Sequence, residues 1–310
     1  MNKQAGLDAN ESLRVNWHEH SALRVEQVPV RKGVTSARLT RTSALLREAP
    51  TFEANRLLAA LPPAERDRLA PHLEPVPVVR GAVLAEPRTR WQHVYFPTSS
   101  ILSMQHLMAD GASSEIASVG NEGMLGVSLF MGGNAMPSRA VAQTSGDGYR
   151  LKAEMLIDEF NRAGVVQQLL LRYAQALLTQ IAQTAACNRH HSVAQQLCRW
   201  LLMNLDRNSS NELSMTQELI AHTLGVRREG VTQAAGVLQQ AGIIRYRRGH
   251  ITVLERAGLE SQVCECYGVV KQELTRLVAC GDDVLNRCAP PAAAASTTMV
   301  AIDDRVPARK

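Results

Sequence analysis

The spacing of apolar residues changes along the chain and separates stretches of different predicted structure. Between Val76 and Leu151, short apolar runs alternate with turn residues, as at positions 132–134 and 146–148. Asp110-Gly111 lies between two of these runs, which is a strong signal for a tight hairpin. Many short strands joined by turns at this spacing predict an antiparallel β-barrel or jelly roll.

After Leu151 the apolar spacing becomes helical. One set of apolar residues advances by three and four positions, as in the seam of a coiled coil. A second set lies beside it and would face the barrel. A symmetric partner would bury the first set, and a single long core helix in a monomer is the alternative. The expected dimer seam is Leu171, Ala174, Leu178, Ile181 and Ala185, and the second set is Leu170, Tyr173 and Leu177.

Residues 213–254 carry a third pattern, which predicts a helix-turn-helix followed by a hairpin. The first helix begins after a capping residue, Ser214 or Thr216. It ends at Gly225, because glycine takes the left-handed turn without steric cost. Two short strands in residues 243–254, with arginines at the turn between them, complete a winged helix-turn-helix.

The second helix of this pattern has an apolar face and a polar face. Its polar residues gather toward the N-terminal end, which is the end that a recognition helix inserts into the major groove. Arg228 can pair there with guanine, and Glu229 can accept from cytosine. Residues 214–256 hold six arginines, three glutamates and no lysine or aspartate, a local net charge of +3 that suits phosphate contacts. The expected DNA contacts are Thr216, Gln217, Arg227, Arg228, Glu229, Thr232, Gln233, Arg247 and Arg248.

The helix-turn-helix segment resembles the winged helix of the Crp/Fnr superfamily of bacterial regulators. The resemblance covers about residues 52–258, and Gly225, Arg228 and Glu229 match the family's Gly-x-x-Arg-Glu pattern. It implies a homodimer that binds a palindromic site on double-stranded DNA and acts with RNA polymerase. Gln233 stands where the family often has a third base-contacting arginine, so the DNA sequence bound is expected to differ.

The sensor part of the resemblance is weaker. Members that bind cyclic nucleotides carry a Gly-Glu pair and a phosphate-binding arginine, whereas Gly126 here precedes a valine and Arg139 is displaced. A buried cyclic phosphate needs an opposing charge, so we expect a small-molecule effector other than a cyclic nucleotide, with Gly126 and Arg139 as candidate pocket residues. A cyclic-nucleotide-responsive regulator and an interaction or sensor protein with a vestigial winged helix are the alternatives. The glycine pattern of residues 120–126 indicates no known binding site by itself.

The cysteines do not predict a metal site or a cofactor. None of them precedes Cys187, which excludes the N-terminal iron–sulfur ligands of some family members. Cys187 with the histidines at 190–191 lacks the further ligands of a closed zinc site. Cys264 and Cys266 would point to opposite sides of a helix, which does not suit chelation. No constellation typical of an enzyme stands out.

These patterns predict an α+β protein, and its 310 residues suffice for two domains with tails. The formal net charge of +5 is compatible with nucleic acid. The N-terminus does not read as a secretory signal and no run is long enough to span a membrane, so a cytoplasmic protein is the default. The expected divisions are a mobile arm (1–50), a cyclic-nucleotide-binding-like barrel (51–160), a dimerisation helix (161–187), a winged helix-turn-helix (188–258), and a helical extension with a disordered tail (259–310).

Overall fold

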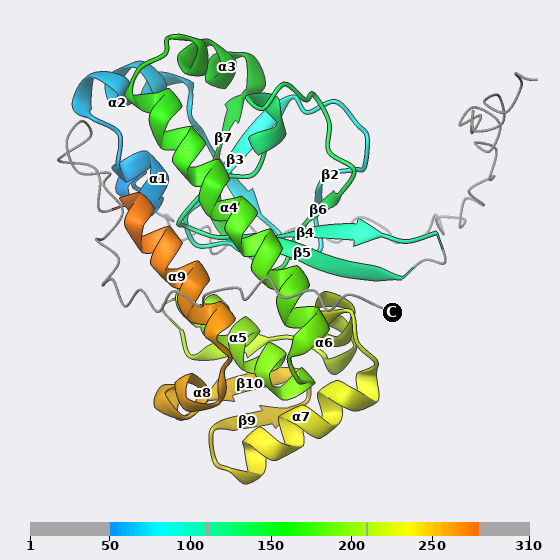
Figure 1. Ribbon diagram of the computed structural model, residues 1–310. Coiled ribbons are helices and arrows are strands. Elements are labelled where there is room, and N and C mark those ends of the chain that lie inside the picture. The colour runs from blue at the N-terminus through cyan, green and yellow to red at the C-terminus, as the bar shows by residue number, and fades with distance from the viewer. Residues whose placement is uncertain (1–49, 110–111, 209, 279–310) are drawn as a thin grey trace, which may run out of the picture. The chain divides into compact units, whose positions relative to one another are not determined.

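The computed structural model describes residues 50–109, 112–208 and 210–278 (Figure 1). The predicted arm and tail, and the hairpin tip at residues 110–111, lie outside these ranges. Within the described ranges no helix has both the length and the apolar character needed to cross a membrane.

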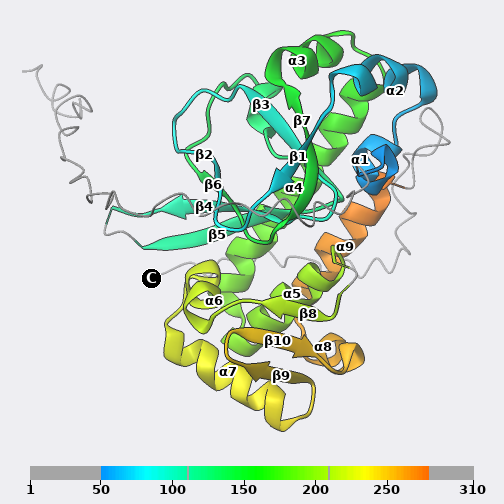
Figure 2. The ribbon, with the colours of Figure 1, turned by 180° about the vertical axis from the view of Figure 1, so that it is seen from behind.

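The first part of the fold is the predicted barrel, which consists of two antiparallel β-sheets preceded by short helices. The sheets have the strand orders β1-β7-β3 and β2-β6-β4-β5, and all their pairings are antiparallel (Figure 2). The predicted run from Val76 to Leu84 is split into two strands around Gly81, whose φ of 81° turns the chain. The strands are β1 (Glu74–Val78), β2 (Val83–Ala85), β3 (His93–Pro97), β4 (Leu102–Leu107), β5 (Ser113–Val119), β6 (Arg139–Ala142) and β7 (Gly146–Lys152).

Helices accompany the sheets at both ends. Pro63 opens one of them, where the missing N–H of proline carries no penalty. The predicted hairpin is confirmed by the pairing of β4 with β5. The helices up to residue 161 are η1 (Phe52–Ala54), α1 (Arg56–Ala59), α2 (Pro63–Leu69), η2 (Ala70–His72), η3 (Val127–Leu129) and α3 (Ala153–Asn161).

The long helix α4 (Val165–His190) carries both predicted sets of apolar residues, here called its two stripes. The stripe of Leu170, Tyr173 and Leu177 is buried in the barrel core, as expected. Leu171 and Leu178, from the predicted dimer seam, are each 50% exposed. Ala185 is exposed and Ile181 is partly buried, whereas Ala174 is buried within the chain's own core. One face of α4 therefore remains open to solvent.

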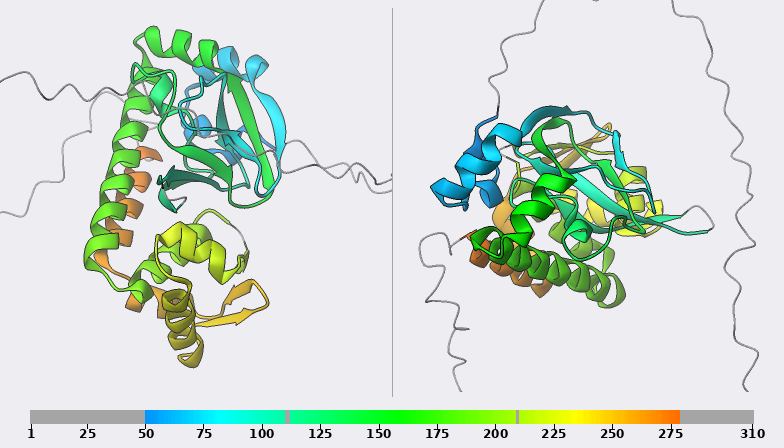
Figure 3. Two further views of the ribbon diagram at one scale, coloured as in Figure 1. Left: turned by 90° about the vertical axis from the view of Figure 1, so that its right-hand side faces the viewer. Right: turned by 90° about the horizontal axis from the view of Figure 1, so that it is seen from above.

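The C-terminal elements form a second core of their own. A three-stranded sheet of order β8-β10-β9 packs with the helices around Leu197, Leu201 and Leu238. Helix α9, with which the described part of the chain ends, runs alongside α4 and contacts it extensively (Figures 1 and 3). The elements are α5 (Val193–Leu205), β8 (Glu212–Ser214), α6 (Gln217–Leu224), α7 (Arg228–Gln240), β9 (Ile244–Arg247), β10 (His250–Val253), α8 (Arg256–Gln262) and α9 (Glu265–Val278).

Candidate nucleic-acid interface

The turn between α6 and α7 is built from local signals in the sequence. Thr216 is the residue that caps α6, and its side chain accepts from the backbone N–H of Leu219 at 3.2 Å; Ser214 lies in β8 instead. Gly225 ends the helix in the left-handed conformation, with φ 66° and ψ 33°. The next N–H, of Val226, returns to the carbonyl of Ala221 at 3.0 Å. This closure sets the direction in which α7 begins.

Helix α7 has the two faces that the sequence predicted. Val231, Ala235 and Leu238 are buried, together with Ala234. Arg228, which begins the helix, is exposed. The other exposed residues near its N-terminal end are Arg227, Glu229, Thr232 and Gln233. Because the core holds one face of α7, the polar face is presented to solvent as a fixed array.

A hydrogen bond links the exposed ends of the two helices. The hydroxyl of Thr232 donates to Oε1 of Gln217 at 2.9 Å and also lies 3.0 Å from the carbonyl of Arg228. Gln217 is half-buried, whereas Thr216 beside it is exposed. The start of α6 and the polar face of α7 therefore share one surface, which suits a phosphate contact next to a base contact.

The hairpin of β9 and β10 has a two-residue turn. Arg247 pairs with His250 across the strands, which leaves Arg248 and Gly249 in the loop. Both loop residues have positive φ, 50° and 80°, as a type I′ turn requires. The hairpin is held to the segment just before α6 by the hydroxyl of Tyr246, which donates to the carbonyl of Met215 at 3.0 Å. The arginines at its tip are exposed.

The surface formed by α7 and this hairpin is cationic. In the part of the chain that the structure describes, Arg227, Arg228, Arg247 and Arg248 form no ion pair with a carboxylate. Their charges are thus available to an external anion. All nine residues expected from the sequence to contact DNA lie on α6, α7, the residues that cap them, or the hairpin tip.

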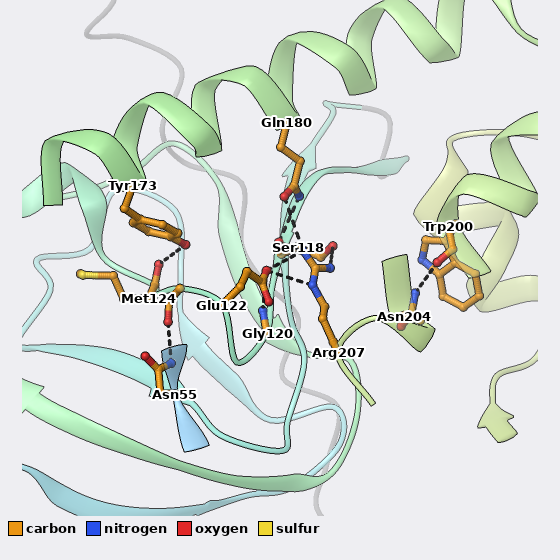
Figure 4. A network of polar contacts seen from close by, with 11 residues as sticks. Asn55, Ser118, Gly120, Glu122, Met124, Tyr173, Gln180, Trp200, Asn204 and Arg207 are labelled. Atoms are coloured by element: carbon orange, nitrogen blue, oxygen red, sulfur yellow. Dashed lines mark hydrogen bonds and ion pairs between the residues drawn. The ribbon is translucent and has the colours of Figure 1, made fainter. Parts of the chain in front are cut away.

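A buried ion pair connects the barrel to the end of α5, and sequence reasoning missed it. Arg207 lies 2.7 Å from the carboxylate of Glu122, with side-chain exposures of 4% and 6% (Figure 4). The guanidinium also donates to the hydroxyl of Ser118 at 2.6 Å and to its carbonyl at 2.9 Å. Gln180 of α4 donates to the same carbonyl at 3.0 Å. Barrel, α4 and α5 therefore meet at one polar cluster.

The glycine pattern of residues 120–126 has a packing role at this cluster. A Cβ on Gly120 would lie 2.7 Å from the side chain of Arg207. A Cβ on Gly123 would lie 2.2 Å from the ring of Tyr173. These glycines therefore let α4 and the end of α5 approach the barrel loop closely, and the hydroxyl of Tyr173 reaches the carbonyl of Met124 at 2.8 Å.

A cavity lies between α4 and the barrel, next to one of the two candidate effector residues. Its volume is about 280 Å³, and it is lined mainly by apolar side chains, with Ser128 and no charged residue among the described ones. Gly126 precedes two of the lining residues, Val127 and Ser128, with φ 119°. Arg139 does not line the cavity and instead pairs with Glu86 at 3.0 Å. The structure therefore brings only Gly126 toward this cavity.

One expectation about the cysteines is wrong. Cys264 and Cys266 do not share a helix, because Cys264 precedes the first residue of α9. Their sulfur atoms lie in one cluster with Cys187 and His191. The sequence does not indicate that Cys187 and His191 meet Cys264 and Cys266, because 77 positions separate Cys187 from Cys264.

Comparisons with known proteins found a match to one domain family and structures with a similar fold. The model of the Crp-like helix-turn-helix domain matches residues 195–262. No curated protein matches the chain by sequence. Among solved structures, a putative transcriptional regulator of the Crp/Fnr family from Eubacterium rectale is similar with a TM-score of 0.55 and 20% identity, over 68% of this chain and 98% of that one.

Two further structures show the same architecture. FixK2 from Bradyrhizobium japonicum has a TM-score of 0.50 at 17% identity, over 62% of this chain and 98% of its own. A transcriptional regulator of the CRP family from Thermus thermophilus has a TM-score of 0.51 at 18% identity, over 60% of this chain and 95% of its own. By its fold the chain is similar to solved transcription regulators of the Crp/Fnr family, and its residues 195–262 match the Crp-like helix-turn-helix domain.

Proposed function

We propose that the protein is a sequence-specific regulator that inserts α7 into the major groove of double-stranded DNA. The observation that carries this proposal is the set of exposed arginines on α7 and the hairpin tip, which form no ion pair with any described residue and are held on a buried apolar core. Phosphate neutralisation supplies the sequence-independent part of the affinity, and base edges supply the selectivity.

Particular residues are assigned to each part. Arg228 lies in the first turn of α7, where a guanidinium can reach guanine N7 and O6. Glu229 can accept from a cytosine amino group, and Gln233, one turn later, can pair with adenine. Arg247 and Arg248 at the hairpin tip, with Thr216 and Arg227 at the N-terminal ends of α6 and α7, would contact phosphates.

The open face of α4 supports a homodimer. Leu171 and Leu178 are half exposed although α9 packs on the same helix, so α9 leaves this face free. Pairing α4 with its symmetric copy would bury these leucines and add Ala185 and Ile181 to the contact. Two copies of α7 would then enter half-sites about one helical turn apart on a palindromic operator. RNA polymerase is the expected protein partner there.

The cavity beside α4 supports an apolar effector over a cyclic nucleotide. A cyclic phosphate carries a charge that apolar walls cannot compensate. Leu178 and Ile181 line this cavity and also belong to the proposed dimer seam. A ligand bound there would therefore act directly on the helix that joins the two copies. The proposed domain boundaries are an arm (1–50), a barrel (51–160), a dimerisation helix (161–187), a winged helix-turn-helix (188–258) and a C-terminal extension (259–310).

Selection of bound DNA from a random pool tests the proposal, followed by titration of the selected site at two salt concentrations. We expect one enriched two-fold-symmetric sequence and a steep fall of affinity with salt, by about 0.9 logarithmic unit per neutralised phosphate for each tenfold rise in salt concentration. An interaction protein with a vestigial winged helix would give neither enrichment nor a salt dependence of this size.

A further inference from the structure

Four potential metal ligands converge where α4 ends and α9 begins. Cys187 lies in the last turn of α4, and His191 is the residue that ends this helix. Cys264 lies between α8 and α9, and Cys266 is in the first turn of α9. One sulfur or ring nitrogen from each residue lies within 4.8 Å of the other three.

The spacing of these atoms suits one tetrahedral ion. The sulfurs of Cys187 and Cys264 are 3.6 Å apart, and the sulfur of Cys266 is 3.6 Å from Nδ1 of His191. Metal–sulfur bonds of about 2.3 Å at tetrahedral angles separate two sulfurs by roughly 3.8 Å. A disulfide would need a separation of about 2.0 Å. Ligands bound to different irons of a cluster would have to lie farther apart.

The surroundings of His191 are those of a metal-bound imidazole. Its Nε2 lies 3.3 Å from the carboxylate of Glu265, while Nδ1 faces the sulfur of Cys266. A carboxylate on the far nitrogen fixes the tautomer that leaves the other nitrogen free to coordinate. Gln196 donates to the carbonyl of His191 at 3.0 Å and so helps to hold the end of α4 in place.

The three thiols are buried, at 0% exposure for Cys187, 4% for Cys264 and 2% for Cys266. Without a metal ion, burial raises the pKa of the Cys187 thiol and that of the Cys266 thiol. A bound dication reverses this preference and deprotonates a coordinating thiol outright. Three thiolates and a neutral imidazole on Zn²⁺ leave one net negative charge. The nearby guanidinium of Arg199, whose Nη1 is buried without a partner among the described residues, is placed to offset it.

We propose that Cys187, His191, Cys264 and Cys266 bind one structural zinc ion. Cysteine and histidine in a closed set of four are the ligands typical of structural zinc. The ligands bracket residues 192–263, so the ion joins the two ends of the helix-turn-helix domain at the end of α4. It also fixes the start of α9, the helix that packs along α4. This assignment does not depend on which DNA sequence, if any, the protein binds.

The test is the metal content of the full-length protein, purified with reductant, without chelator and without a histidine tag. We expect one zinc per chain by mass spectrometry of the metals. Replacing the zinc by cobalt should give thiolate-to-cobalt charge-transfer absorption and the intense visible bands of a tetrahedral site. The double variant Cys264→Ser/Cys266→Ser should lose the zinc, whereas His191→Cys should keep it.

Cys198→Ser is the matched control, because Cys198 is equally buried but lies outside the group of four. It should retain one zinc per chain. The proposal is overturned if the folded wild-type protein neither contains zinc nor takes up cobalt with a thiolate spectrum, which requires no variant to fold. An iron–sulfur chromophore, a disulfide between these cysteines, or zinc retained in the double variant would overturn it equally.

Discussion

Breaking the buried ion pair between Arg207 and Glu122 should destabilise the protein far more than breaking an exposed pair of the same length. The change is Arg207→Met, which leaves the carboxylate of Glu122 without its cation in a site where its side chain is 6% exposed. An uncompensated buried charge costs about 3–5 kcal/mol. The variant also loses the bonds from the guanidinium to Ser118.

The matched control is the pair of Arg150 and Glu74. These two side chains approach to the same 2.7 Å but are 41% and 49% exposed. Solvent and salt screen such a pair, so Arg150→Met should lower the free energy of unfolding far less than Arg207→Met does. The two ion pairs have the same length and differ in burial, and only Arg207 also bonds to Ser118.

Urea unfolding followed by tryptophan fluorescence measures both effects. Trp91 in the barrel and Trp200 in α5 are buried, so the signal reports on both sides of the contact. Adding Glu122→Gln to Arg207→Met removes the stranded charge, and the double variant should recover roughly 1–3 kcal/mol relative to the sum of the two single changes. Strictly additive costs, or a loss no larger than in the control, would refute the buried contact between barrel and α5.

Three further predictions concern separate parts of the molecule. Burial raises the pKa of the Glu115 carboxyl to about 7, above the ordinary 4.5. The stability that the protonated carboxyl contributes is therefore fully present below pH 4.5 and is lost as pH rises through 7. Glu115→Gln should raise the free energy of unfolding at pH 8 by up to about 3 kcal/mol but should not raise it at pH 4. If denaturation at the two pH values shows the same difference, the burial argument fails. Arg248→Asn should stabilise the type I′ turn by up to about 1 kcal/mol, because asparagine tolerates positive φ better, while weakening cognate and scrambled DNA alike in a binding titration; a selective loss would mean that Arg248 contacts a base. Leu178→Glu should yield monomers in sedimentation velocity, whereas Val237→Glu, at a position that is also 50% exposed, should not; a dimer that survives Leu178→Glu would place the interface elsewhere.

The parts of the fold that follow from local signals could be predicted from the sequence. Gly225 ends α6, and the spacing of Val231, Ala235 and Leu238 marks the buried face of α7, because each signal acts within one or two helical turns. The two stripes of α4 were readable for the same reason. Ala174 shows the limit of such predictions, since the heptad spacing does not reveal that this position is buried in the chain's own core.

Long-range contacts could not be predicted in this way. Arg207 and Glu122 are 85 positions apart, and no local sequence pattern indicates that they contact each other. The glycines at 120 and 123 could have signalled a close approach, but not which side chain fills the space. Cys187 and Cys264 likewise meet because the chain returns to the end of α4 after α8, and residues after position 258 carried no signal for that path.

The most direct test of the central claim is the base-pair dependence of Arg228. The affinities of the wild-type protein, Arg228→Ala and Arg276→Ala are measured on the selected operator, on single base-pair variants of it and on scrambled DNA. Arg276 lies on α9, far along the chain from the proposed interface, and controls for loss of charge alone. We predict that Arg228→Ala loses about 1–3 kcal/mol at one base pair and becomes indifferent to that pair. Equal losses on operator and scrambled DNA, or no loss at all, would contradict the insertion of α7 into the major groove.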